Sequence, residues 1–144
     1  MSTLAVATVK SISSAAPVFK NTSGTEIGTL CKAYVNFDGT VGGTNKTISS
    51  SFNVSTVTDN GLGDYTINFT NNMSNANYVV SGNSGLGIIS GSYSAWTSVY
   101  IHASGGSPYR QDPTTSSFRV TISRMGDSAY LQDYDRVSIA VFGD

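Results

Sequence analysis

Two acidic residues near the C-terminal end are the side chains that most suggest acid–base chemistry. Asp133 and Asp135 stand two positions apart around Tyr134, so in an extended segment their carboxylates share one face. Glycosidases use such a pair of carboxyl groups as acid and base. The same spacing is common on polar surfaces, and the neighbouring Arg136 favours local ion pairing. We therefore interpret the pair as structural and keep glycoside hydrolysis as the lesser alternative.

A second group of acidic and amide side chains lies in a glycine-rich segment. Asp59, Asn60 and Asp64 flank Gly61 and Gly63 and could offer oxygen ligands to Ca²⁺. They lack the spacing of an EF-hand loop and its closing Glu, whereas turn formation alone explains Asp and Asn at such positions. The segment predicts a turn, and we expect no metal.

The sequence gives little support to nucleophilic catalysis. His102 is the one histidine, and no acidic residue close to it in sequence could orient it as a base. Cys31 is the one cysteine, which excludes an intramolecular disulfide, and we expect it to be a small buried apolar residue. The chain has no G-x-S-x-G elbow or phosphate-binding loop, and too few Cys and His residues for a zinc site. We predict no catalytic residues, no enzymatic activity and no cofactor.

Aromatic residues in the second half of the chain could contact a ligand. Tyr93, Trp96, Tyr100 and Tyr109 could form a platform on which sugar rings stack. Alternatively, Trp96 belongs to the core and the three tyrosines line a contact between subunits, which we favour. These four residues are our candidates for partner or glycan contact.

The composition argues against several classes of partner. The net charge is −1 and charged residues make up 12% of the chain. Because the eight Lys and Arg residues are scattered among neutral ones, we expect no nucleic-acid binding. No apolar run approaches the ~20 residues of a membrane span, and the N-terminus lacks the basic region of a signal peptide. Hydroxyl and amide groups dominate the polar residues.

Alternating apolar residues predict a β-fold. Ala33, Val35 and Phe37 alternate with polar residues, which is typical of a half-buried strand. Asn60-Gly61 predicts a hairpin turn. We expect about eight strands in an antiparallel β-sandwich of the jelly-roll or immunoglobulin-like type. The expected strands are 30–37, 48–57, 65–69, 78–80, 88–89, 95–101, 118–122 and 137–141.

The first 28 residues lack this clear alternation. They could form a first strand with a long connection, or an extended N-terminal arm that becomes ordered against a partner. We favour the arm, and we assign residues 29–144 to the β-sandwich domain, since a chain of 144 residues has the usual size of one domain.

Five segments resemble a block found in virion proteins of tailed bacteriophages. They read CKAYVNFDGT (31–40), SFNVS (51–55), TDNG (58–61), GDYTINF (63–69) and NANY (75–78). Residues 2–6, 17–19 and 24–28 are similar to the lead-in that precedes this block. The resemblance covers about the first 80 residues, implies a structural particle component and supplies no catalytic residues. The stretch after Ser81 carries no resemblance.

The resemblance also implies a location and partners. The block often lies in long fibre chains, whereas this chain has 144 residues and no internal repeat. We therefore expect a capsid decoration (cement) protein on the capsid exterior that binds the major capsid protein. The resemblance implies a homo-oligomer, and a trimer, because decoration proteins often occupy threefold positions. The alternative is a receptor-binding or carbohydrate-binding module of a tail fibre or spike.

Overall fold

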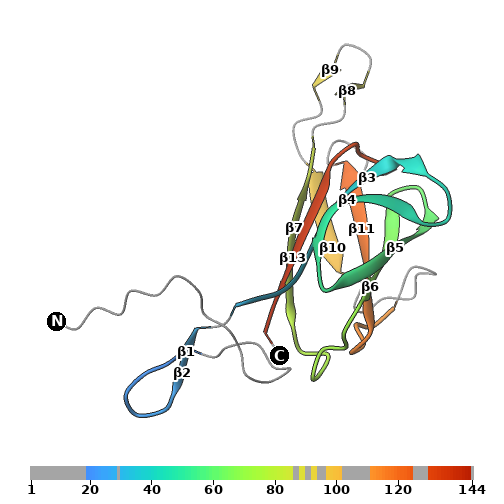
Figure 1. The fold of residues 1–144 in the computed structure, drawn as a ribbon. Helices are drawn as coiled ribbons and strands as arrows, with labels where there is room; N and C mark the ends of the chain where they lie inside the picture. The colour runs from blue at the N-terminus through green and yellow to red at the C-terminus, as the bar shows by residue number, and fades with distance from the viewer. Residues whose placement is uncertain are drawn as a thin grey trace. The chain divides into compact units, whose positions relative to one another are not determined.

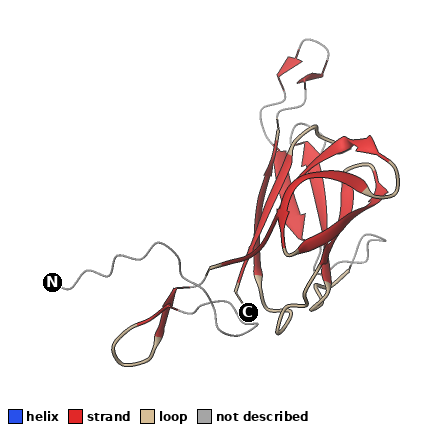
Figure 2. Ribbon diagram, in the orientation of Figure 1, coloured by secondary structure: helices blue, strands red, loops and turns tan. Residues whose placement is uncertain are grey.

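The computed structural model describes residues 19–28, 30–85, 88–89, 92–93, 97–101, 111–124 and 130–143. Every regular element in these ranges is a β-strand (Figure 2), which confirms the predicted all-β fold. No helix in the described ranges has the length and apolar character needed to cross a bilayer. The chain divides into two compact units, residues 1–30 and 31–144.

The first unit contains a hairpin of two short strands. β1 (Phe19–Lys20) pairs antiparallel with β2 (Glu26–Gly28). Asn21 organises the turn, since its Oδ1 accepts a hydrogen bond from the backbone N–H of Thr25 (2.9 Å). Gly24 has a φ of 83°, a conformation that favours glycine. A strand pair therefore lies in the segment for which the sequence left a first strand and an arm open.

In the second unit two larger antiparallel sheets form a β-sandwich-like arrangement (Figure 1), and β8 and β9 pair in a separate two-stranded sheet. Its strands are β3 (Cys31–Gly42), β4 (Lys46–Phe52), β5 (Val54–Gly61), β6 (Asp64–Phe69), β7 (Val79–Ser84), β8 (Ile88–Ile89), β9 (Ser92–Tyr93), β10 (Thr97–Ile101), β11 (Ser117–Arg124), β12 (Tyr130–Leu131) and β13 (Val137–Phe142). The first sheet has the order β4-β3-β13-β7, and the second β10-β11-β6-β5, with β12 beside β11. Eight of the described strands have five or more residues. They are not the same eight as predicted, since the segment 48–57 is divided between β4 and β5 and the predicted strand 88–89 has two residues.

Side chains from both sheets form one apolar core. Successive side chains of a strand point to opposite faces, so alternate residues are buried. The inward residues predicted for the segments 65–69, 118–122 and 137–141 are confirmed. The buried apolar residues are Ala33, Val35, Phe37, Val54, Val57, Tyr65, Ile67, Phe69, Met73, Tyr78, Phe118, Val120, Ile122, Tyr134, Val137, Ile139 and Val141.

The chain passes from the first sheet to the second at Asn53, between β4 and β5. Asn53 has a φ of 54°, a left-handed conformation that Asn tolerates better than most residues. Its side chain fixes the corner: Oδ1 accepts from the backbone N–H of Asn71 (2.8 Å), and Nδ2 donates to the carbonyl of Lys32 (3.3 Å). The prediction of one strand over 48–57 is therefore wrong. Phe52 is 54% exposed and Val54 is buried, so the two do not share a face as predicted.

Two further boundaries differ from the prediction. The β5–β6 hairpin is present, but Gly61 pairs with Asp64 and the turn lies at Leu62-Gly63. Gly63 has a φ of 62°, and a Cβ there would lie 2.5 Å from the backbone N of Gln132. The tight approach of another segment selects this glycine.

A strand end expected at Ser81-Gly82 is also absent. β7 continues through both residues to Ser84 because each of its residues pairs with one on β13. Glycine weakens a strand locally, but this long-range pairing prevails over the local preference.

Substitution of Asn53 tests the corner. Asn53→Ala loses the side-chain hydrogen bonds and must hold the left-handed φ, so we expect the free energy of unfolding to fall by about 2–3 kcal/mol. Asn53→Gly keeps the φ without strain and should lose about 1 kcal/mol less. Urea denaturation of the purified variants measures both, with the exposed Asn72→Ala as a control expected to stay within about 0.5 kcal/mol of the parent. Equal losses for Ala and Gly would contradict this interpretation.

Candidate functional site

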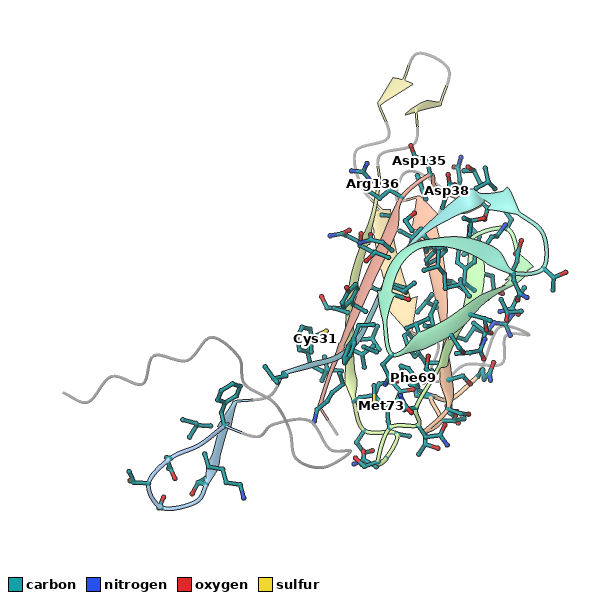
Figure 3. The ribbon with its side chains drawn as sticks, in the orientation of Figure 1. Cys31, Asp38, Phe69, Met73, Asp135 and Arg136 are labelled. Carbon is teal, nitrogen blue, oxygen red and sulfur yellow. The ribbon has the colours of Figure 1, made fainter. Side chains whose placement is uncertain are left out.

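The carboxylate pair expected from the sequence is divided between two environments. Oδ1 of Asp133 accepts hydrogen bonds from the backbone N–H of Gly63 (2.7 Å) and from the Tyr65 hydroxyl. Asp135 is exposed and lies at the end of the second unit that also carries Asp38 and Arg136 (Figure 3). Asp133 therefore holds the β5–β6 turn, which supports the structural interpretation of this pair.

Tyr65 is the partner that makes this contact strong. Its side chain is fully buried, and that burial, followed by the hydrogen bond to Asp133, raises the pKa of the phenol above its usual range. The hydroxyl therefore remains protonated and donates to the carboxylate. A buried phenol of this kind stabilises the fold and does not serve as a base near neutral pH.

The acidic residues of the turn segment 59–64 each pair with a cation. Asp64 is bound by Arg119 through two contacts, Nε to Oδ1 (2.7 Å) and Nη2 to Oδ2 (2.5 Å). Asp59 pairs with Lys46 at 2.7 Å between Nζ and Oδ2. Among the residues that the structure describes, no group of three or more His, Cys, Asp or Glu residues is arranged to hold a metal ion. The geometry assigns these carboxylates to ion pairs.

The remaining predicted residues fall mainly outside the described ranges. Cys31 is half-buried, and its thiol donates to the carbonyl of Ala33 (3.1 Å). His102, Trp96 and Tyr109 lie outside the described residues. The backbones of two candidates are placed, Tyr93 in β9 and Tyr100 in β10. The proposal that these aromatic residues contact a partner or glycan stays a prediction.

The feature that the sequence reasoning missed is a continuous surface on the first sheet. The pairing register sets two rows across the four strands, on the face that points away from the core. One row is Phe52, Tyr34, Ala140 and Ser81, and the other is Ser50, Asn36, Ser138 and Asn83. Phe142 and Val79 pair beside the first row. We call these ten residues the outer face, and none of them is charged.

The outer face exposes aromatic and apolar groups around a shallow hollow. The rings of Tyr34 and Phe52 stack with centroids 6.3 Å apart and planes inclined by 29°. Val79 is 64% exposed and Phe142 37%. Ser138 donates to Oδ1 of Asn36 at 2.5 Å. A depression of about 300 Å³ lies over β13, lined by Tyr34, Val35, Asn36, Ser81, Gly82, Asn83, Ser138, Ile139 and Ala140.

Charged side chains lie at the ends of this surface. By strand alternation Asp38 lies at one end of the outward row on β3, and Arg136 is exposed just before β13 at the same end. Lys32 lies at the other end of β3, where the pairing with β13 shifts register. Hydrogen bonds from the side chain and backbone of Thr40 (2.6 and 2.8 Å) lower the pKa of Asp38, so this carboxylate keeps its negative charge at neutral pH. Protein interfaces have this organisation, with few charges and more aromatics at the centre and a polar rim.

Comparison with known proteins adds no relative. The chain matches no family model, no curated protein and no solved structure. The outward positions of the predicted strands could have revealed the outer face, because Tyr34, Asn36, Ser138 and Ala140 are all uncharged. What the sequence could not supply was the register that makes them neighbours.

The Asp64–Arg119 pair yields a prediction about stability. The Asp64 side chain is 2% exposed and that of Arg119 17%, so removing one partner leaves a largely buried charge behind. We expect Asp64→Asn to lower the free energy of unfolding by about 3 kcal/mol. Adding Arg119→Met should then cost less than it does alone, giving a coupling of about 1–3 kcal/mol in a double-mutant cycle.

Urea denaturation with the exposed Asp135→Asn as a matched control measures this cycle. The control should change stability by less than about 0.5 kcal/mol. Strictly additive effects of the two substitutions would show that the pair contributes no coupling and that the ion-pair assignment is wrong.

Proposed function

We propose that this chain is a non-enzymatic structural protein of a tailed-bacteriophage particle, and that it decorates and stabilises the capsid exterior. The observation that carries the proposal is the outer face, a broad uncharged surface with exposed aromatics and charges at its ends. The resemblance of residues 31–78 to phage virion proteins names the setting in which such a surface would work. The fold alone would not imply any function.

The positions of the acidic groups support a binding role over a catalytic one. Asp133 accepts from Gly63 and Tyr65, and Asp64 is engaged by Arg119. A general acid or base must reach the proton it transfers in a substrate complex, and these carboxylates are committed to other segments of the chain. Their chemistry therefore serves the fold.

The outer face suits binding to a repeated protein lattice. A protein that binds the assembled lattice and not its free subunits stabilises the lattice by mass action. Because a particle offers many equivalent sites, modest contacts at each site sum through multivalency. The major capsid protein is the partner that this role requires, and the outer face is the described surface that we propose for self-association or capsid contact.

A second candidate function follows from the stacked pair Tyr34–Phe52. Two neighbouring rings at 6.3 Å, with the Asn36 amide beside them, could bind a neutral sugar by stacking and hydrogen bonding. This would suit the receptor-binding module of a tail fibre or spike. It places the same protein at another position in the particle.

Copy number per particle separates the two functions. Quantitative mass spectrometry of purified particles, with the major capsid protein as internal standard, should find a number of copies comparable to the capsid sites, in the hundreds. A handful of copies per particle would instead identify a tail component. Absence from purified particles would overturn the proposed function altogether.

A further inference from the structure

The one Asn-Gly pair of the sequence, Asn60-Gly61, does not form the turn that it predicts. The turn lies at Leu62-Gly63, and Asn60 is an extra residue of β5, since Asp59 pairs with Tyr65 and Gly61 with Asp64. We propose that Asn60 is a site of spontaneous deamidation, and that the native β5–β6 hairpin holds it unreactive. This chemistry is independent of the proposed function.

Deamidation at Asn60 needs no group beyond the chain itself and water. The backbone nitrogen of Gly61 attacks Cγ of Asn60, the bond from Cγ to Nδ2 breaks, and ammonia leaves with the proton that the Gly61 nitrogen gives up. Water then opens the resulting five-membered imide at either carbonyl, which yields aspartate or isoaspartate. Because Gly61 carries no side chain, nothing next to its nitrogen hinders the attack.

The two reacting residues are open to solvent. Asn60 and Gly61 are both exposed, so the water that completes the reaction has access to them. An intramolecular reaction of this kind depends on how often its two groups reach an attacking geometry. Protection of Asn60 must therefore come from the positions in which the fold holds the side-chain amide and the backbone nitrogen.

Hydrogen bonds hold both groups. Nδ2 of Asn60 donates to Oγ1 of Thr66 on β6 (2.9 Å) and to Oδ1 of Asp64 (3.3 Å), which ties the leaving nitrogen to the neighbouring strand. The N–H of Gly61 donates to Oδ1 of Asp59 (2.9 Å). Ring closure requires the side-chain amide to give up its contacts, and it removes the proton that the Asp59 carboxylate holds in place.

The acidic acceptors of these hydrogen bonds are themselves anchored. Asp59 pairs with Lys46 at 2.7 Å, and Asp64 is bound by Arg119 through two contacts. The side chain of Asp64 is 2% exposed. Release of Asn60 therefore requires local opening of the hairpin, and the open fraction sets the rate of a reaction that only the open form allows.

The products of deamidation fit the hairpin poorly. Aspartate at position 60 would present a carboxylate to Oδ1 of Asp64 in place of an amide donor. Isoaspartate would also add a methylene to the main chain between two backbone pairs, Asp59 with Tyr65 and Gly61 with Asp64. The reaction is irreversible, so each event would leave a permanently loosened β5–β6 hairpin.

Peptide mapping of the full chain by mass spectrometry, after incubation at mildly alkaline pH, tests the proposal. We expect the folded chain to deamidate at Asn60 about a hundredfold more slowly than the chain unfolded in guanidinium chloride. Thr66→Val keeps the branched shape and removes one acceptor, so it should speed the reaction of the folded chain about fivefold, the equivalent of one hydrogen bond.

Thr58→Val is the matched control. Thr58 faces Thr66 across the hairpin and its Oγ1 accepts from Nδ2 of Asn68 (3.2 Å), so the variant loses a similar hydrogen bond without touching Asn60. Its rate should stay within about twofold of the parent. Equal rates in the folded and unfolded parent overturn the proposal, and so does a Thr66→Val rate no higher than that of Thr58→Val.

A second measurement applies if Thr66→Val fails to fold, which thermal unfolding of each variant reveals. Asn60→Asp should lower the midpoint of thermal unfolding by about 3 °C relative to the neutral Asn60→Ser, because it places a carboxylate against Asp64. Equal midpoints for the two variants would show that the contact with Asp64 does not hold Asn60, and would overturn the protection assigned to it.

Discussion

The second unit is organised around the buried side chain of Tyr65. Its ring meets Phe37 edge-on across the two sheets, with centroids 5.0 Å apart, and Lys46 Nζ lies 5.9 Å from its centroid. A buried hydroxyl must find a hydrogen-bond partner, and Asp133 supplies it from a segment 68 residues away in the sequence. A Cβ at Gly39 would collide with this hydroxyl. One phenol thus joins β6 to β3, to the start of β4 and to the segment before β13.

The outer face is neutral in a chain whose described charged residues are largely engaged elsewhere. The chain has few charged residues, and several of those described are used inside or at the margins of the fold: Asp64 with Arg119, Asp59 with Lys46, and Asp133 with Tyr65. The outward positions of the first sheet carry amides, hydroxyls and rings. Such a surface associates through shape and many small contacts, and its few terminal charges give orientation more than affinity.

Sequence periodicity was sufficient for the strands that alternate cleanly. Val137, Ile139 and Val141 are buried as predicted. Alternate residues of a strand lie on one face of the sheet, and a face that carries only apolar side chains packs against the core. Asn53 could not be recognised, since the alternation of Phe52 and Val54 looks continuous until the chain crosses between sheets. The candidate surface was hidden for a different reason: its neutral outward residues lie far apart in the sequence, and they become one surface only through pairings such as Tyr34 with Phe52 and Ala140.

Side-chain footprinting with hydroxyl radicals tests most directly whether the outer face is the surface through which this protein assembles. The protein would be labelled when dilute and when assembled, at high concentration or on particles, and each residue compared with itself. Tyr34, Phe52 and Phe142 should lose most of their reactivity on assembly, whereas Leu62 and Val41, exposed elsewhere on the same unit, should keep theirs. Unchanged reactivity of Tyr34 and Phe52 in the assembled protein would contradict the account.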